Sequence, residues 1–254
     1  MREYTNTITL TKNSRGIYSL DTSLGCASRM ANNSKGCYND CYAQRYSKKY
    51  GYDFSKTVLR YFKNENHVKS IISKINKVEL DFIRIGTSGD PSENWEHTLS
   101  IIDKIKDCNK QIVIITKHWT NLTEEQLSKL MSYNVCINTS ISALDESNLL
   151  NNALFQHEKL NLFCKAVLRI VSCDFNLENE TGKKLSIVQE NIFKNYKVLD
   201  TVFRVSKNNK LVTDGIINIK ETKFLGKKCN VSKYNKKAYF GKCSSCLEMC
   251  GINM

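Results

Sequence analysis

Short apolar runs that alternate with segments of helical periodicity constrain the fold of this chain most. Runs rich in β-branched residues predict strands at 80–86, 111–116, 134–141, 165–171 and 199–205, with a further strand near 15–24. Helical periodicity predicts helices at 97–107, 123–133 and 184–196, the second of which begins with a capping box formed by Thr123 and Gln126. Strands separated by helices run parallel, so we predict an α/β fold, either an open doubly wound sheet or a partial barrel of six βα units.

The same alternation predicts where ligands bind. In both architectures they bind at the carboxyl ends of the parallel strands. Pro91 is the only proline, and no repeat or flexible linker divides the chain. We therefore expect one domain over residues 1–225, followed by a cysteine-rich tail, residues 226–254, that packs on it.

The charge of the chain favours an anionic partner. Its 254 residues include 38 Lys and Arg against 25 Asp and Glu, a formal net charge of +13. Such a charge suits a phosphate, a nucleotide or a nucleic acid, although lysines spread this evenly also fit a solvated surface. The N-terminus lacks the apolar stretch of a signal peptide, and no window approaches the roughly 20 apolar residues of a membrane-spanning helix. We expect a cytoplasmic protein with no membrane contact.

Three of the 11 cysteines, Cys26, Cys37 and Cys41, lie in one polar loop after the first predicted strand. Structural zinc sites normally close a shell of four ligands, and this loop holds neither a fourth cysteine nor a histidine. Three thiolates suit a 4Fe-4S cluster with one open iron, so we favour iron–sulfur over zinc. Other cysteines occur singly in apolar or mixed segments, where a cysteine acts as a small buried hydrophobe; they are Cys108, Cys136, Cys164 and Cys173.

The loop resembles the cluster loop of radical S-adenosylmethionine enzymes. Gly25-Cys26, Ser34-Lys35-Gly36-Cys37 and Cys41-Tyr42-Ala43 are similar to a signature of phage-associated members, although the Cys-x10-Cys-x3-Cys spacing departs from the usual three and then two residues. The resemblance implies a partial (β/α)6 TIM-like barrel. It also implies that the open iron binds S-adenosylmethionine, which an electron from the cluster cleaves to methionine and a 5′-deoxyadenosyl radical.

The resemblance extends to IGTSGDP, residues 85–91, at the end of the second predicted strand. In the superfamily this backbone segment holds the amino group of the cofactor's methionine. The resemblance assigns that role to Gly86, Thr87, Ser88, Gly89 and Asp90, whereas Ser-Gly-Asp-Pro is also ordinary turn chemistry.

Further candidate cofactor residues lie at the ends of later strands or flank the cysteines. Lys117 and His118 end the third strand, where a cation suits a carboxylate or phosphate but also a solvated strand end. Polar residues on one face of the fourth strand suit ribose or substrate; they are Asn138, Ser140 and Ser142. The candidates for the cofactor's carboxylate are Arg169 and Arg204, and those for covering the cluster or stacking on adenine are Tyr38 and Tyr42.

The tail carries four more cysteines, Cys229, Cys243, Cys246 and Cys250. Their spacing fits a closed site of four thiolates, which is compatible with structural zinc or an auxiliary iron–sulfur cluster. Similar tails occur in phage-associated relatives, so we lean towards iron–sulfur.

The resemblance implies an enzyme that abstracts hydrogen from an organic substrate and takes its electron from a protein such as flavodoxin or ferredoxin. The compact size and positive charge of the chain suit a small, phosphorylated or nucleoside-like substrate. Lyases that act on modified nucleosides, such as queuosine lyases that release queuine, are one match; a repair lyase similar to spore photoproduct lyase, which binds long DNA, is another. A third alternative is a non-catalytic zinc module that binds nucleic acid. No motif identifies a catalytic acid, base or hydrogen donor.

Overall fold

The computed structural model describes residues 5–31, 41–203, 205, 207–224, 227–231, 242 and 245–254, with the backbone alone at 30–31, 202 and 221–231. Within these residues the fold is α/β, as predicted, and is built on a seven-stranded sheet in the order β1-β2-β5-β6-β7-β8-β10. Neighbouring strands from β2 to β10 are parallel, and β1 is antiparallel to β2. The strands are β1 (Thr11–Lys12), β2 (Tyr18–Ser19), β5 (Phe82–Ile85), β6 (Gln111–Thr116), β7 (Val135–Ile141), β8 (Lys165–Ser172) and β10 (Val198–Val202).

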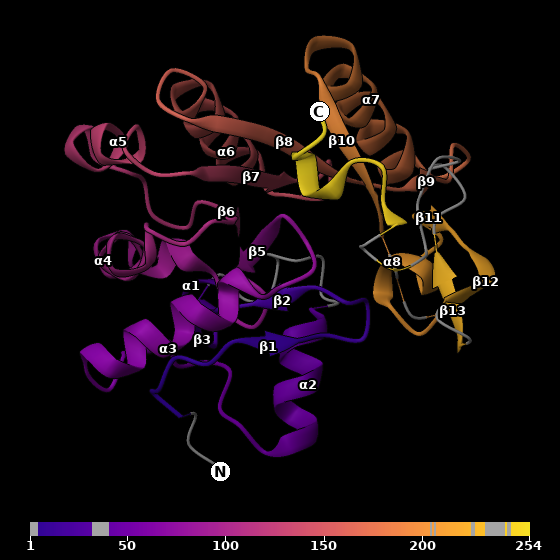
Figure 1. Ribbon diagram of the computed structural model, residues 1–254. Helices are drawn as coiled ribbons and strands as arrows, with labels where there is room; N and C mark the ends of the chain where they lie inside the picture. The colour runs from indigo at the N-terminus through magenta and orange to yellow at the C-terminus, as the bar shows by residue number, and fades with distance from the viewer. Residues whose placement is uncertain are drawn as a thin grey trace.

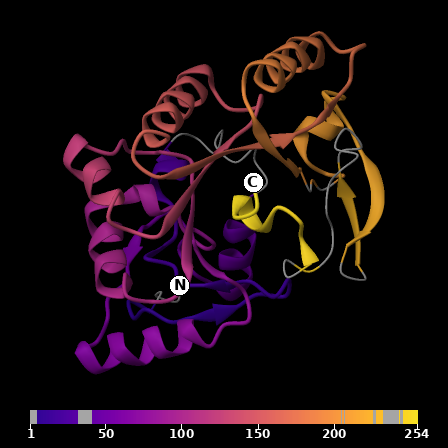
Figure 2. The same cartoon turned by 45° about the horizontal axis from the view of Figure 1, so that its top comes forward.

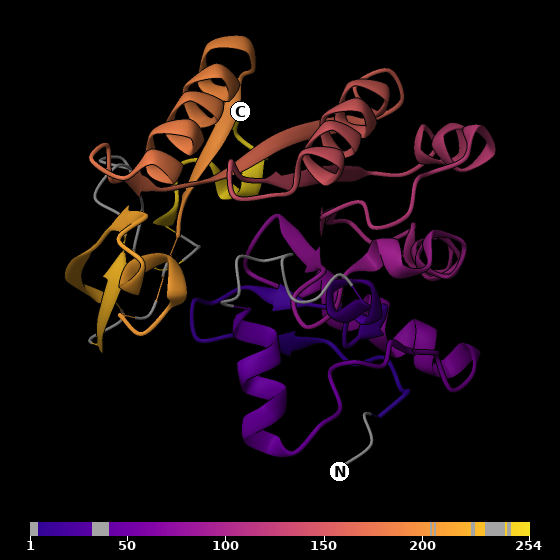
Figure 3. The ribbon, with the colours of Figure 1, turned by 180° about the vertical axis from the view of Figure 1, so that it is seen from behind.

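Five helices connect these strands and follow one another along one side of the sheet (Figures 1 and 3). They are α3 (Glu65–Asn76), α4 (Trp95–Ile105), α5 (Glu124–Leu130), α6 (Ser147–Leu160) and α7 (Glu180–Asn195). The C-terminal segment, residues 245–254, lies against the other side of β7 and β8 (Figure 2). Because side chains alternate along a strand, each strand sends one set of residues towards the helices and the other towards this segment.

Shorter elements complete the described chain. Two short helices, α1 (Ala27–Ala31) and α2 (Tyr42–Tyr50), flank the cysteine loop, and α8 (Lys210–Thr213) precedes the C-terminal hairpin. The 3₁₀ helices are η2 (Pro91–Glu93) and η4 (Met249–Gly251). Antiparallel pairs outside the main sheet are β3 (Ser23–Leu24) with β4 (Val58–Leu59), β9 (Asp174–Phe175) with β11 (Ile217–Asn218), and β12 (Lys220–Phe224) with β13 (Lys227–Val231).

The sequence predicted the long buried strands well. The strand expected at 111–116 is β6, those expected from 80, 134, 165 and 199 are β5, β7, β8 and β10, and the capping box of Thr123 and Gln126 begins α5. The strand expected near 15–24 is instead two short strands, β2 and β3, because the chain leaves the main sheet after Ser19 and pairs Ser23 with Leu59. Helix α6 was not predicted because its asparagines and central glutamine interrupt the helical spacing of its apolar residues.

Buried apolar residues of the sheet belong to more than one cluster. Ile114 and Ile137 are fully buried, and Ile141 and Ile170 pack with Leu150 of α6. Strands covered on both sides read as near-continuous apolar runs, which is why their sequences were recognisable. Cys108, Cys136 and Cys173 are buried as expected, whereas Cys164 is half-buried. No described helix is long and apolar enough to cross a membrane.

Candidate functional site

The loop after β5 (residues 86–90, called the β5 loop from here on) is held in place by the carboxylate of Asp21, which follows β2. Its Oδ1 accepts hydrogen bonds from the backbone N–H groups of Gly86 and Thr87 over 3.1 and 2.7 Å, and its Oδ2 accepts one from Ser88 over 3.0 Å. Burial raises the pKa of Asp21, while the hydrogen bond from Thr87 and the charge of Arg84 oppose that shift. One side chain therefore satisfies three consecutive donors and holds the loop at the carboxyl ends of β2 and β5.

Glycines allow the cysteine loop and the β5 loop to touch. The Gly25 N–H donates to the carbonyl of Ser88 over 3.1 Å, and Gly25 forms a parallel bridge with Gly89. A Cβ at Gly89 would lie 2.6 Å from the carbonyl oxygen of Ser23 and 2.8 Å from that of Gly25. Only glycine permits this approach, so Gly89 has a structural role that turn chemistry alone does not require.

Two of the three predicted cluster ligands come together beside this contact. Cys26 is buried with Ala43 and Phe54, and Cys41 packs against the same group. The Cys26 thiol donates to Oε1 of Glu93 over 3.2 Å, and burial, followed by the charges of Asp90 and Glu93, raises its pKa. Cys37, the third predicted ligand, lies outside the described residues, as does Tyr38.

Glu93 links the cysteine loop to η2. Besides the Cys26 thiol, its Oε1 accepts the backbone N–H of Ser28 over 2.9 Å, and its Oε2 accepts the hydroxyl of Thr57 over 3.1 Å. The Cys26 side chain is therefore held in place by a group that follows the β5 loop.

Tyr42 reaches from the first turn of α2 to the β5 loop. Its hydroxyl donates to the carbonyl oxygen of Thr87, while 54% of the residue stays exposed. Enclosure of the hydroxyl raises the pKa of Tyr42 to about 12, an effect that the charges of Arg84 and Arg169 oppose and that of Asp21 reinforces. The predicted residues Tyr42, Thr87 and Arg169 thus share one electrostatic environment.

The Asp90 side chain attaches the β5 loop to the end of β6 through hydrogen bonds. Its Oδ1 accepts from the Ser92 hydroxyl and from the Thr116 hydroxyl, both over 2.7 Å, and its Oδ2 accepts the Lys117 backbone N–H over 2.8 Å. Burial raises the pKa of Asp90, and the bond from Thr116 opposes that shift. The side chain caps η2 and ties the ends of β5 and β6 together.

Lys117 and His118 are buried rather than solvated. The Lys117 ammonium lies 2.8 Å from both carboxylate oxygens of Asp145, and only 8% of the Lys117 side chain is exposed. His118 has a φ of 54°, its Nε2 lies 2.9 Å from the Thr139 hydroxyl, and burial lowers its pKa to about 3. The sheet end at β6 thus contains a neutral histidine and an internally paired lysine.

The polar residues predicted on β7 share the face that the C-terminal segment covers. The Asn138 amide donates to the carbonyl of Cys250 over 3.0 Å, and Ser140 lies opposite Arg169 in the parallel register. Ser142 instead donates its hydroxyl to the carbonyl of Val171. Arg204, the alternative to Arg169, lies outside the described residues.

The second predicted metal site is described only in part. The Cys246 thiol donates to Oε2 of Glu248 over 3.3 Å. Cys250 is half-buried and has a φ of 60°. Cys229 lies in β13, opposite Thr222 of β12. Cys243 lies outside the described residues. Among side chains that the structure does describe, no three metal-ligating groups gather.

The donors that are described fit an iron–sulfur cluster at the first site. Cys26 and Cys41 offer two thiols in one apolar group that also includes Trp119, and the loop that would receive the cofactor is their immediate neighbour. Cluster ligands are cysteine thiolates, so cluster binding would require the Cys26 thiol to lose the proton that it donates to Glu93.

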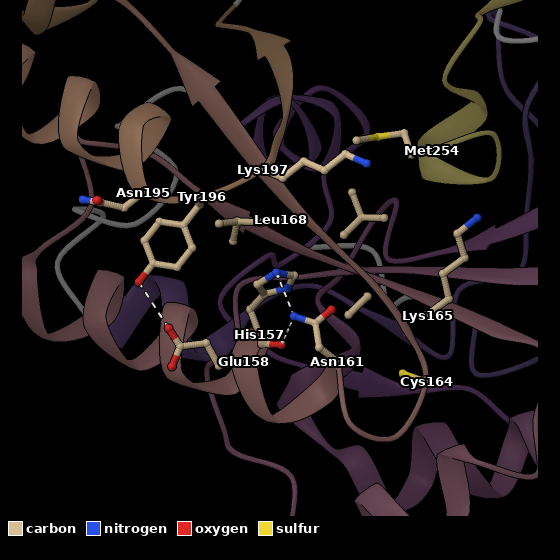
Figure 4. A pocket seen from close by; sticks show the side chains of 12 residues that line it. His157, Glu158, Asn161, Cys164, Lys165, Leu168, Asn195, Tyr196, Lys197 and Met254 are labelled. Atoms are coloured by element: carbon tan, nitrogen blue, oxygen red, sulfur yellow. Dashed lines mark hydrogen bonds between the residues drawn. The ribbon is translucent and has the colours of Figure 1, made fainter.

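A cavity of about 480 Å³ lies at the opposite edge of the sheet, at the amino ends of β8 and β10 (Figure 4). Lys165, Lys197, His157 and Met254 are among its lining residues, and the Lys165 ammonium donates to the carbonyl of Ile252 over 2.6 Å. None of the predicted cluster or cofactor residues lines it. This cavity is separate from the candidate site.

Sequence reasoning missed Asp21, Glu93 and Arg84. Asp21 follows β2 and Glu93 ends η2, both at the carboxyl edge of the sheet, which was the available signal. Nothing in the local pattern tells which carboxylate orders a neighbouring loop. Arg84 lies inside β5 and donates to the Thr87 hydroxyl over 3.4 Å. No family model matches the chain, and no curated protein is a significant match to it.

Proposed function

We propose that this protein is a radical S-adenosylmethionine enzyme with a partial (β/α)6 barrel, and that Cys26, Cys37 and Cys41 bind its 4Fe-4S cluster. The observation that carries the proposal is the contact of Gly25 with Ser88 and Gly89, which brings the cysteine loop against the β5 loop. A curved sheet is supported by the row of helices α3 to α7 on one side and the C-terminal segment on the other.

The β5 loop suits the amino group of the cofactor's methionine. Asp21 already engages the N–H groups of Gly86, Thr87 and Ser88. The carbonyl oxygens of Thr87 and Ser88 accept one hydrogen bond each, from the Tyr42 hydroxyl and the Gly25 N–H. A carbonyl oxygen has two lone pairs and accepts from an ammonium, which is a donor only. We assign this role to the backbone of 86–89, with Asp90 maintaining the loop on β6.

Arginines beside the loop suit the cofactor's carboxylate. Burial raises the pKa of the Tyr42 hydroxyl, whereas the charges of Arg84 and Arg169 both lower it. Arg84 also donates to the Thr87 hydroxyl over 3.4 Å. Arginine presents planar paired donors that match a carboxylate. Asn138 and Ser140 share the Arg169 face and suit hydroxyl groups of the cofactor or substrate. Lys117 has a smaller role in this proposal because Asp145 neutralises its charge.

When bound and reduced, the cluster would supply the electron that cleaves S-adenosylmethionine to methionine and a 5′-deoxyadenosyl radical. The residues of this chain bind and orient the cofactor and exclude water. The substrate class that we propose is nucleoside-like or phosphorylated, in keeping with the net charge of +13, and a lyase such as a queuosine lyase is the reaction that we rank first.

Metal content and cofactor cleavage test the proposal together. We would purify wild type and the Cys26→Ala/Cys37→Ala/Cys41→Ala variant without oxygen, measure iron, sulfide and zinc, and assay 5′-deoxyadenosine formation with dithionite. Wild type should hold iron and sulfide and cleave the cofactor, and the triple variant should lose cleavage. The matched control is Cys164→Ala, because Cys164 is a half-buried cysteine outside the site.

The alternatives give different results in the same experiment. Zinc without iron in wild type, and no cofactor cleavage, would refute the radical enzyme and favour a zinc-containing nucleic-acid-binding module. Iron that survives in the triple variant would point to the C-terminal cysteines as a second cluster site. A repair lyase would share the iron and the cofactor cleavage, so it is separated by tight, strongly salt-dependent binding to long double-stranded DNA.

A further inference from the structure

Helix α2 carries a row of exposed tyrosines, of which Tyr46 and Tyr50 play no part in the proposed cofactor site. Tyr42, Tyr46 and Tyr50 recur every four residues, and they are 54%, 60% and 40% exposed. Residues spaced by four lie on the same side of a helix. The helix packs on the protein through a different row, Ala43 and Ser47, which are buried. The tyrosines are therefore not held by the core.

The outer two tyrosines form one aromatic platform. The ring centroids of Tyr46 and Tyr50 are 4.5 Å apart, and the Lys49 ammonium lies 5.5 Å from the centroid of the Tyr50 ring. Tyrosine faces of this kind accept stacked bases because every base has a π face.

Basic residues line the same helix. The sequence of α2, YAQRYSKKY, contains no acidic residue, and Arg45, Lys48 and Lys49 are all exposed. Arg45 and Lys49 precede Tyr46 and Tyr50 directly, so they form a second row beside the aromatic one. Lysine is depleted at protein–protein interfaces, whereas lysine and arginine interleaved with aromatic rings are typical of surfaces that bind single-stranded nucleic acid.

The row leads to the candidate site. Tyr42 stands at its inner end, where its hydroxyl donates to the carbonyl of Thr87 in the β5 loop. From there the helix extends away for nine residues, about 14 Å at the rise of an α-helix. A strand that lies along α2 would thus bring a nucleotide to the cofactor loop.

We infer that α2 binds single-stranded nucleic acid, with bases on Tyr46 and Tyr50 and phosphates near Lys48 and Lys49. In the proposed radical enzyme this strand would present the nucleoside-like substrate to the cofactor loop, and in that respect the inference rests on the proposed function. Duplexes bind less well because their base faces are stacked inside the helix, and a free nucleoside reaches only the inner end of the row.

Fluorescence anisotropy with labelled oligo(dT) and oligo(U) of about 12 nucleotides tests the inference on the full-length protein. Tyr46→Ala/Tyr50→Ala should weaken binding by about 5- to 150-fold for each stacked base that is lost, and the variant removes both stacking sites. The matched control is Tyr61→Ala, a tyrosine that is 50% exposed and lies against His97 instead.

The charge contribution is read from salt dependence between about 50 and 200 mM salt. Lys48→Gln/Lys49→Gln should reduce the slope of log affinity against log salt by about 0.7 for each phosphate that the variant no longer neutralises. The control variant Lys74→Gln/Lys77→Gln should leave this slope unchanged. These exposed lysines also lie at the C-terminal end of a helix, so both double variants remove two cations from the same position relative to a helix dipole.

Either of two results would overturn the inference: wild type that binds neither oligonucleotide at the lower salt concentration, or binding that Tyr46→Ala/Tyr50→Ala leaves unchanged. The assay needs neither a reduced cluster nor S-adenosylmethionine. Binding of the oligonucleotides without cleavage of S-adenosylmethionine would therefore refute the proposed function but support the inference about α2. Cleavage of S-adenosylmethionine without oligonucleotide binding would support the proposed function but refute the inference.

Discussion

The carboxylate of Asp21 accepts the backbone N–H of Thr87 over 2.7 Å, although Asp21 follows β2 and Thr87 follows β5. The same carboxylate takes the N–H groups on either side of Thr87. The geometry of the β5 loop therefore depends on a side chain 66 residues earlier in the chain.

Replacing this carboxylate should loosen the loop. Asp21→Asn keeps the shape but turns one acceptor into a donor that faces the Ser88 N–H, so we expect a loss of about 1–3 kcal/mol in the free energy of unfolding and faster exchange of the loop amides. Urea unfolding and hydrogen exchange measure both. The control is Asp53→Asn, where the carboxylate accepts from Ser55 within a turn and lies 3.8 Å from the exposed Lys56 ammonium. Equal losses in the two variants would contradict this account.

The buried pair of Lys117 and Asp145 should couple strongly. Lys117→Met leaves a buried carboxylate without its cation and should cost about 3–5 kcal/mol of unfolding free energy. Adding Asp145→Asn should recover at least about 1 kcal/mol, because the asparagine still accepts the Ser142 N–H without a charge. Lys106→Met, which breaks the exposed pair with Asp103, should cost at most about 1 kcal/mol. A double variant no more stable than Lys117→Met would refute the coupling.

The C-terminal segment should depend on Gly251. A Cβ at Gly251 would lie 2.5 Å from Cγ2 of Val167, whereas one at Gly16 would meet nothing within 4 Å, and the φ angles of the two glycines are similar, 89° and 82°. Gly16→Ala should cost about 1–2 kcal/mol from backbone strain alone. Gly251→Ala should in addition release the segment from β8, which limited proteolysis with mass spectrometry detects as faster cleavage within 245–254. Equal protection in the two variants would show that the packing on Val167 is dispensable.

Asp200 should make stability depend on pH. Burial raises its pKa from the ordinary 3.8 to about 6, and the Ser172 hydroxyl opposes that shift. The folded state then binds the proton more tightly than the unfolded state, so this contribution to unfolding free energy falls as pH rises from about 4 to about 6.

Asp200→Asn should therefore stabilise the protein by about 1–2 kcal/mol near pH 7, a value reduced for partial exposure, and change little near pH 4. Urea unfolding at both pH values measures the difference. Asp107→Asn, at an exposed aspartate, is the control. Stabilisation by Asp200→Asn that is the same at both pH values would contradict the assignment.

The strands were predictable from the sequence because burial on both faces of the sheet requires a run of apolar residues. Such a run can be recognised in the local sequence without knowing which segments pack against it. The strand expected near 15–24 failed for the opposite reason. Its residues divide between the main sheet at Ser19 and the pairing of Ser23 with Leu59, and a local pattern does not encode that choice.

The sequence predicted which residue types make up the candidate site, but it did not predict which of those residues contact one another. Cys26, Cys41 and the loop after β5 were singled out because cysteines cluster and glycines follow a strand. The pairing of Lys117 with Asp145 and the hydrogen bonds of Asp90 to Thr116 join segments 26 or more residues apart, so only packing decides whether such groups are free to bind a ligand.

By itself the sequence determined the α/β class and the basic charge, and it predicted a ligand site at the carboxyl edge of the sheet, because these follow from local periodicity and composition. Tertiary structure alone decided that Asp21 orders the β5 loop, that Gly25 meets Gly89 and that the tyrosines of α2 stay exposed. The reason is that these features depend on which segments face one another in three dimensions, and a side chain's partners, burial and pKa are set by those neighbours rather than by its own position along the chain.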